Sequence, residues 1–125
     1  YYEAKKNGAT EVVMWGTGQP VRDFVYAGDV AATIPFFIED YPSSDPVNIS
    51  SGTRTTIAEL AETIKEMTGF EGEIVWDTSK PDGQPRRCLN TSKAEKEFGF
   101  KAKTDFEEGL LKTIKIQVIC ILSGH

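Results

Sequence analysis

The stretch that decides how this chain folds is Trp15-Gly16-Thr17-Gly18-Gln19-Pro20-Val21-Arg22-Asp23-Phe24. Residues 11–14 and 23–26 read as short strands, so the glycines between them predict a compact turn. Such a turn holds an aromatic ring at one end and a guanidinium at the other, facing one cleft. A flat ring stacks on a base or sugar, and a guanidinium fork suits a phosphate. The stretch therefore favours a nucleotide or nucleotide-sugar ligand at Trp15 and Arg22, although a hairpin with a core tryptophan and a solvated arginine fits the same residues.

Composition narrows the class of protein. The 125 residues make one domain or part of one, and the net charge of -5 argues against a general binder of nucleic acid or of anionic membranes. Cys88 and Cys120 fit no metal spacing, and their expected reduced state predicts a cytoplasmic protein. The sequence shows no signal peptide and no apolar run of membrane length. The only histidine is His125, which excludes histidine-dependent zinc sites and catalytic triads.

Capping residues and apolar periodicity predict alternating helices and strands. The most regular segment is 56–69, where Thr56-Ile57-Ala58-Glu59 matches a capping box and apolar residues follow at helical spacing until Gly69. Further helices are predicted at 1–7, 28–41, 91–98 and after a second capping box at 104–107. Strands are predicted at 11–14, 23–26, 47–49 and 73–76, with a long loop over 77–88. This order predicts a mixed α/β fold with helices packed on a small sheet.

The segment 28–41 carries two signals of its own. Pro35 lies inside it and predicts a kink or an early stop. The apolar surface of its face with Phe36 and Phe37, together with that of the strand at 47–49, is larger than the other elements can cover. We therefore expect this surface to face a larger sheet. Left open, this surface predicts a homodimer or a domain swap.

All four arginines lie outside the predicted helices, at positions 22, 54, 86 and 87. Arginine confined to loops of an acidic protein favours local recognition of an anion, because its fork meets phosphate with paired hydrogen bonds. The loop Lys80-Pro81-Asp82-Gly83-Gln84-Pro85-Arg86-Arg87 is stiffened by two prolines. In it, Asp82 suits ribose or sugar hydroxyls and Arg87 a diphosphate. The alternative is a charged surface turn that Asp82 merely begins.

Together these segments resemble the C-terminal part of the GDP-L-fucose synthases, within the extended short-chain dehydrogenase/reductase family of sugar-nucleotide epimerases and reductases. The similarity runs from about residue 2 to residue 114. Its more specific motifs are W-G-T-G-Q-P-V-R-D-F-V-Y at 15–26 and W-D-T-S-K-P-D-G-Q-P-R-R at 76–87. Asp29-Val30-Ala31, V-N-I-S-S-G at 47–52 and T-I-A-E-L-A at 56–61 indicate only the wider group of epimerases and dehydratases.

The resemblance implies a fold and a set of site residues. The fold is α/β (mixed α+β): the C-terminal substrate-binding portion of an extended short-chain dehydrogenase/reductase, lacking most of the Rossmann domain. It spans residues 1–114, and residues 115–125 form a divergent tail. The residues implied to bind the GDP-sugar substrate are Trp15, Arg22, Asp82 and Arg87.

The resemblance also implies a reaction for the full-length parent. That reaction is the NADPH-dependent conversion of GDP-4-keto-6-deoxymannose to GDP-L-fucose, by epimerisation at two carbons and then hydride transfer. The family's glycine-rich dinucleotide loop, its Ser, its Tyr-x-x-x-Lys pair and its epimerising Cys and His lie upstream of residue 1, and neither Cys88 nor His125 aligns with them. We therefore expect no catalytic, cofactor-binding or metal-binding residue here, with NADP(H) serving the parent only.

Two alternatives stay open on the sequence. The chain also fits part of another NAD-dependent sugar-nucleotide epimerase or dehydratase, with a different preference for base and sugar. It fits as well a stand-alone, non-catalytic binding or interaction domain.

Overall fold

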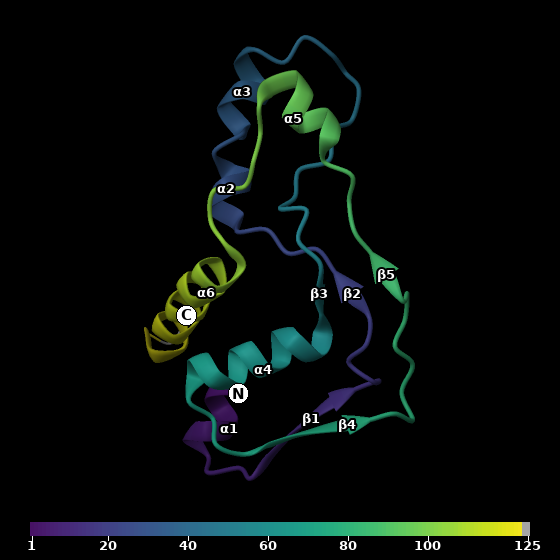
Figure 1. Cartoon of the computed structure of the whole chain (residues 1–125). Helices are drawn as coiled ribbons and strands as arrows, with labels where there is room; N and C mark the ends of the chain where they lie inside the picture. The colour runs from purple at the N-terminus through teal and green to yellow at the C-terminus, as the bar shows by residue number, and fades with distance from the viewer. Residues whose placement is uncertain (124–125) are drawn as a thin grey trace.

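A computed structural model describes residues 1–123, apart from the side chain of Leu122. The end of the predicted divergent tail, with His125, lies outside the described residues. The elements, in chain order, are α1 (Tyr2–Lys6), β1 (Glu11–Trp15), β2 (Val21–Arg22), α2 (Ala27–Ala31), α3 (Ile34–Glu39), β3 (Thr55–Thr56), α4 (Ile57–Thr68), β4 (Glu73–Asp77), β5 (Arg86–Arg87), α5 (Ser92–Phe98) and α6 (Phe106–Ser123) (Figure 1). This order confirms the mixed α/β prediction.

The longer of two sheets pairs β1 with β4 in parallel. Its register runs from Glu11 opposite Glu73 to Trp15 opposite Asp77. Exposure alternates along β1, as expected for strands with one covered face. On the open face Val13 is 53% exposed and Val75 37% exposed, so this face carries apolar side chains without a cover among residues 1–123.

The shorter sheet has the order β3-β2-β5 and decides where the arginines lie. β2 pairs antiparallel with β3, Arg22 opposite Thr55, and parallel with β5, Arg22 opposite Arg87. The strand predicted at 23–26 is therefore wrong, because pairing stops at Arg22. The carbonyl of Phe24 accepts from Ser51 Oγ at 2.5 Å, and that of Tyr26 accepts the first N–H groups of α2.

The strand predicted at 47–49 is also wrong. Residues 47–49 pair with no other strand of the described chain, and the side chain of Asn48 instead donates to the carbonyl of Asn90 at 3.4 Å. The loop predicted over 77–88 contains β5, whose two residues are too few to show a periodicity.

Helix α4 forms as its sequence predicts. Thr56 Oγ1 accepts from the N–H of Glu59 at 3.1 Å, and the Glu59 carboxylate accepts from the N–H of Thr56 at 2.7 Å, which completes the capping box. The helix ends at Gly69 in a left-handed conformation, with φ of 60°. The prediction for this helix is confirmed.

The segment predicted as one helix at 28–41 is divided into α2 and α3, with Pro35 in the first turn of α3. The predicted break is therefore confirmed, but the exposure of Phe36 and Phe37 is not. Both rings pack against Phe98 of α5, at centroid distances of 4.7 and 5.2 Å. The exposed apolar residues of α3 are instead Ile34 (52%) and Ile38 (78%).

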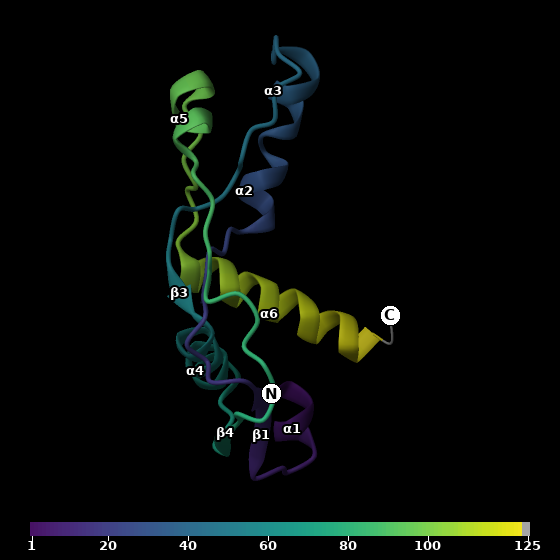
Figure 2. The same cartoon turned by 90° about the vertical axis from the view of Figure 1, so that its right-hand side faces the viewer.

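Helix α6 is capped one residue later than the sequence predicts. Asp105 accepts from the N–H of Glu108 at 2.9 Å, so Asp105 caps the helix. Thr104, the predicted cap, donates its hydroxyl to Asp29 at 2.9 Å instead. α6 packs beside α4 and then runs away from the two sheets (Figure 2). Across residues 1–123, none of the helices has both the length and the apolar character to cross a membrane.

Candidate functional site

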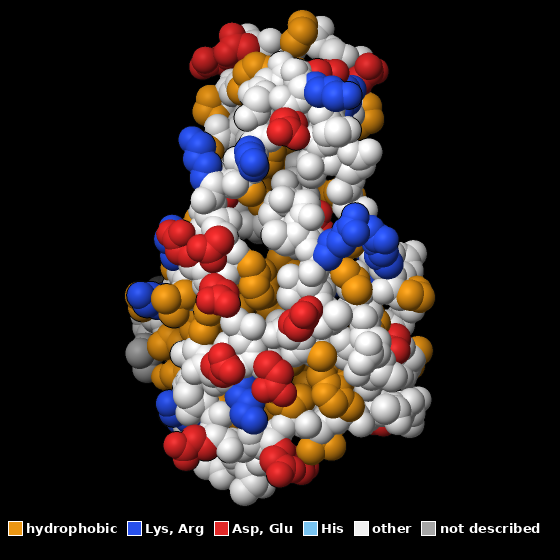
Figure 3. All heavy atoms as spheres, in the orientation of Figure 1, with side chains coloured by type: hydrophobic (Ala, Val, Ile, Leu, Met, Phe, Trp, Pro, Cys, Tyr) orange, Lys and Arg blue, Asp and Glu red, His pale blue; other side chains and the backbone are white. Residues whose placement is uncertain are grey.

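The shorter sheet brings the arginines together. Arg22 and Arg87 are register partners on neighbouring parallel strands, Arg86 precedes Arg87, and Arg54 directly precedes β3. Figure 3 shows Lys and Arg side chains gathered at the right-hand edge, at the height of β5. A local cationic surface in a chain of net charge -5 is a candidate site for an anion.

Arg22 is held by backbone carbonyls. Its Nη1 atom donates to Val21 O at 2.8 Å and to Gln84 O at 2.9 Å, so the side chain reaches across to the loop before β5. A guanidinium has five N–H donors. Within residues 1–123, Nε and Nη2 of Arg22 have no such partner, which leaves donors for a bound anion.

Trp15 stands on the surface at the carboxyl end of β1. Its side chain is 73% exposed, which is incompatible with a core tryptophan. Lys80 Nζ lies 5.8 Å from the ring centroid, within the range of a cation–π contact. Among the described residues no ring contact or hydrogen bond joins Trp15 to Arg22 or Arg87. The ring is therefore exposed at one end of the turn over residues 16–20, and Arg22 lies in the strand at its other end.

Asp82 is tied to the turn that follows Trp15. Its carboxylate accepts from Thr17 N at 2.6 Å and from Thr17 Oγ1 at 2.7 Å. The backbone N–H of Thr17, and then its hydroxyl, hold the pKa of Asp82 below its usual range. The sequence motif contained Thr17 and Lys80, but nothing in it showed which side chains they would contact.

The turn itself is fastened to the start of α4. Gly18 O accepts from Ala58 N at 2.9 Å, and Pro20 O accepts from Ile57 N at 3.0 Å. Gly18 has a φ of +76°, and a Cβ there would lie 2.7 Å from the ring of Trp76. Only glycine meets both conditions, so this residue sets the path of the chain between Trp15 and Arg22.

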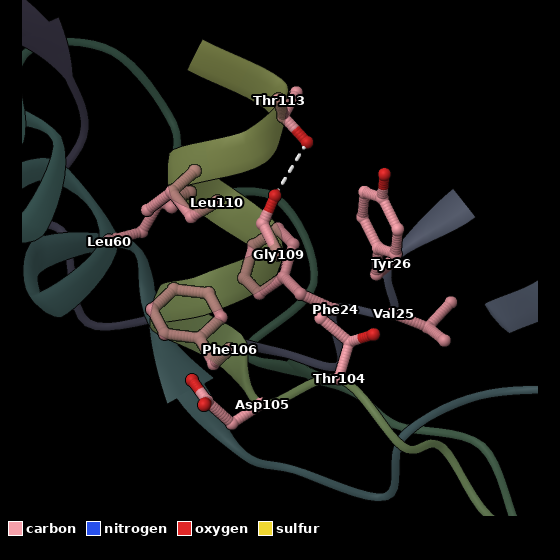
Figure 4. A pocket seen from close by; sticks show the side chains of 10 residues that line it. All are labelled: Phe24, Val25, Tyr26, Leu60, Thr104, Asp105, Phe106, Gly109, Leu110 and Thr113. Carbon is pink, nitrogen blue, oxygen red and sulfur yellow. Dashed lines mark hydrogen bonds between the residues drawn. The ribbon is translucent and has the colours of Figure 1, made fainter. Parts of the chain in front are cut away.

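One apolar cavity lies behind this surface, between residues 24–26 and helices α4 and α6 (Figure 4). It measures about 180 Å³ and lies beside Phe24 and Phe106, whose centroids are 5.8 Å apart. The hydroxyl of Thr113 donates to Gly109 O at 2.8 Å, and the carboxylate of Asp105 caps α6. The hydroxyl of Thr113 and the carboxylate of Asp105 are therefore already hydrogen-bonded within the chain.

The described carboxylates form no metal-binding cluster. Residues 1–123 contain no group of three or more Cys, His, Asp or Glu side chains placed to hold a metal ion. Hydrogen bonds lower the pKa of Asp29, mainly from Thr104 N–H, and of Glu59, mainly from Thr56 N–H. Like Asp82, Asp29 joins two distant segments of the chain, whereas Glu59 bonds Thr56 within its own capping box.

The chain belongs to the GDP-mannose 4,6 dehydratase family, whose match covers residues 2–113. Its sequence is 46% identical over 124 residues to the probable GDP-L-fucose synthase 1 of Oryza sativa subsp. japonica, covering 99% of this chain and 38% of that protein. It is 34% identical to the GDP-L-fucose synthase of Escherichia coli (strain K12), over 90% of this chain and 38% of that protein.

Solved structures agree with the sequence comparison. The GDP-L-fucose synthetase of Naegleria fowleri bound to NADP matches with a TM-score of 0.87 and 30% identity, over 96% of this chain and 38% of that one. The UDP-glucose 4-epimerase of Thermotoga maritima with UDP-glucose matches with a TM-score of 0.76 and 29% identity, over 94% and 38%. The resemblance predicted from the motifs is thereby confirmed, and the chain spans well under half the length of these relatives.

The domain division at residue 114 stays a prediction. The family match ends at residue 113, whereas the match to the rice protein runs over 124 residues.

Proposed function

We propose that this chain provides the GDP-sugar side of the cleft in a nucleotide-sugar epimerase/reductase of the GDP-L-fucose synthase type. The observation that carries the proposal is the register pairing of Arg22 with Arg87, with the exposed ring of Trp15 at the other end of the turn that leads to Arg22. Relatives named GDP-L-fucose synthase, which align over most of this chain, support it.

The proposed roles follow from the chemistry of the side chains. The guanidinium groups of Arg22 and Arg87 pair with the diphosphate, since charge-assisted hydrogen bonds to planar forks are strong and directional. Trp15 stacks on the guanine base or the sugar. Asp82 belongs to the loop that borders the same site.

The cofactor of the full-length enzyme is, in this proposal, NADP(H), which supplies the hydride for the reduction. The start of α4, the best-capped helix of this chain, does not fit that group. The first three N–H groups of α4 are already taken by Pro20 O, Gly18 O and Thr56 Oγ1, so the helix offers no free amides for a pyrophosphate. We therefore assign this chain no step that passes through NADP(H).

Titration with GDP and GDP-fucose tests the proposal, with tryptophan fluorescence as the readout. Binding is expected in the millimolar range, about -4 kcal/mol, because a one-sided site offers one stacking plate and two charge pairs. Arg22→Ala and Arg87→Ala should each weaken it, and added salt should weaken it further. Quenching that ignores both substitutions and salt would be non-specific stacking and would reject the site.

Two controls make this titration specific. Trp15→Leu should remove the quenching, because the ring of the second tryptophan, Trp76, packs at Gly18. Arg54→Ala should have less effect, since alternation along β3 turns Arg54 to the opposite face from Thr55, the partner of Arg22.

Two further outcomes separate the alternatives. Tighter binding of UDP than of GDP would favour another sugar-nucleotide enzyme, as the similarity to a UDP-glucose 4-epimerase allows. Incubation of the chain with NADPH and GDP-4-keto-6-deoxymannose should leave the absorbance of NADPH unchanged; oxidation above a buffer control would overturn that expectation. We also propose a cytoplasmic location, which the free thiols of Cys88 and Cys120 support.

A further inference from the structure

The loop between β4 and β5 is fastened to the Trp15 turn at its start, middle and end. At the start, Gly16 N donates to Asp77 O at 3.0 Å. At the end, Val21 N donates to Pro85 O at 2.9 Å and Arg22 Nη1 to Gln84 O at 2.9 Å. In the middle, Thr17 donates two hydrogen bonds to Asp82, and Lys80 Nζ lies 5.8 Å from the centroid of the Trp15 ring.

The middle of this loop has little other support. Residues 81–85 form no ladder with another strand, and Pro81 and Pro85 have no N–H to donate. Gly83 has a φ of +75° with nothing within 4 Å of where its Cβ would be, so this part of the loop is in open space. The Asp82 carboxylate thus provides the hydrogen bonds that join the middle of the loop to the turn.

Gly16 provides a second, independent sign that this contact shapes the turn. Its φ is +85°, and a Cβ on it would overlap the Asp82 carboxylate. A side chain at position 16 would therefore disfavour the backbone conformation and also push Asp82 away from Thr17.

We propose that Asp82 is a positioning residue: through its bridge to Thr17 it holds the 78–85 loop on the Trp15 turn, so that the ring and the Arg22–Arg87 pair face one diphosphate-bearing nucleotide together. This inference rests on the proposed function and refines the role of Asp82 in it. The bridge acts on both sides of the site at once. Trp15 directly precedes the turn, and Arg87 follows the loop that Asp82 anchors.

Charge makes the inference separable from a simple electrostatic effect. Asp82→Asn removes a negative charge near a bound anion, which by itself tightens binding. It also removes one acceptor of the Thr17 bridge, which on this inference loosens binding. Thr17→Val removes the hydroxyl at constant charge, and Thr17→Ser keeps it.

The experiment measures GDP affinity by Trp15 fluorescence for the whole chain and these variants. Asp82→Asn and Thr17→Val are each expected to weaken GDP binding about 3- to 10-fold. The double variant should bind GDP no more weakly than whichever single variant binds it less tightly, because both substitutions remove the same bridge. Thr17→Ser should stay within about twofold of the original chain. Asp105→Asn is the matched control, because Asp105 also accepts a backbone N–H but lies at the start of α6.

The outcomes are distinct. If the original chain binds GDP and Thr17→Val binds it equally well, or if Asp82→Asn tightens binding, the positioning role is wrong. If the two substitutions add, Asp82 contacts the ligand directly and the inference is again wrong. A chain that fails to bind any nucleoside diphosphate would reject the proposed function, and the inference with it. Circular dichroism of each variant identifies any loss of GDP binding that is caused by unfolding. In that case Thr17→Ser, which keeps the hydroxyl, should bind GDP like the original chain if the bridge positions the loop.

Discussion

The two sheets of this protein are built in opposite ways. β1 and β4 form a parallel ladder of five register pairs, with the apolar side chains of Val13 and Val75 on its open face. The sheet β3-β2-β5 has strands of only two residues and carries Arg22, Arg86 and Arg87. In the first sheet the ladder holds the strands together, whereas the second depends on contacts made by turns and side chains.

This difference shows where the protein is rigid and where its candidate site is vulnerable. A long ladder keeps its shape when one contact is lost, but a two-residue ladder does not. The contacts that hold the short sheet are few. The carbonyls of Gly18 and Pro20 accept hydrogen bonds from the start of α4, Thr56 caps α4, and Asp82 bridges to Thr17. Removing these contacts one at a time, from the largest expected effect to the smallest, tests the comparison.

Gly18→Ala is expected to have the largest effect. A Cβ at this position would lie 2.7 Å from the Trp76 ring and 3.0 Å from the Ala58 side chain, in a backbone with φ of +76°. Left-handed strain and overpacking together should cost about 2–4 kcal/mol of unfolding free energy. Urea denaturation measures the loss. Gly83→Ala is the matched control, since Gly83 has φ of +75° with no atom nearby, and should cost about 1 kcal/mol. Equal losses would show that packing at Gly18 does not join the two sheets.

Thr56→Ala should have the next largest effect, because Thr56 both pairs with Val21 and caps α4. Losing the cap is expected to lower the free energy of unfolding by about 1 kcal/mol. Thr91→Ala provides the control, since the side chain of Thr91 makes no capping hydrogen bond to α5. The same denaturation experiment compares the two variants, and a cost as large for Thr91→Ala would contradict the assignment.

Acid should weaken the same contacts. The pKa values of Asp29, Glu59 and Asp82 are lowered in the folded chain by hydrogen bonds from Thr104, Thr56 and Thr17. A lowered folded pKa stabilises the protein above the unfolded pKa, about 4, and this contribution is lost as pH falls through the folded pKa. Unfolding free energy should therefore be steady between about pH 5 and 7 and fall below about pH 4. Asp82→Asn should make this loss of unfolding free energy below about pH 4 smaller. If the pH dependence of the unfolding free energy is unchanged, Asp82 does not contribute to it.

Substitution on the open face of the long sheet should have the smallest effect on stability. Val13→Thr with Val75→Thr keeps β-branched side chains, so unfolding free energy should change by less than about 0.5 kcal/mol. Binding of a hydrophobic dye, and any self-association seen by light scattering, should decrease because apolar area is removed. Ile38→Thr on the exposed face of α3 is the companion variant, and shows which of the two surfaces supports the self-association that the sequence predicts. A clean monomer at high concentration that binds no dye would contradict the self-association.

The parts predicted correctly from sequence are those that neighbouring residues decide. Thr56 and Glu59 lie three positions apart and form the capping box without help from the rest of the chain. Gly69 and Gly99 end their helices because glycine adopts positive φ at little cost. The strands at 11–15 and 73–77 are long enough for alternation to show. The roles of Trp15, Arg22 and Arg87 in the candidate site stay a prediction from their residue types.

Only the tertiary structure decided what those residues contact. Asp82 accepts hydrogen bonds from Thr17, 65 positions away in the sequence. Asp29 accepts from the hydroxyl of Thr104, 75 positions away, so the cap of α6 is Asp105 instead. Strands β2, β3 and β5 are too short to carry a periodic signal, so their pairing came from the turn fastened to α4. Local sequence determined this protein's capped helices and its longer strands, because backbone conformation and capping act over a few residues. The meeting of the arginines and the bridge at Asp82 required the fold, because a hydrogen bond needs its donor and acceptor within about 3 Å whatever their distance along the chain.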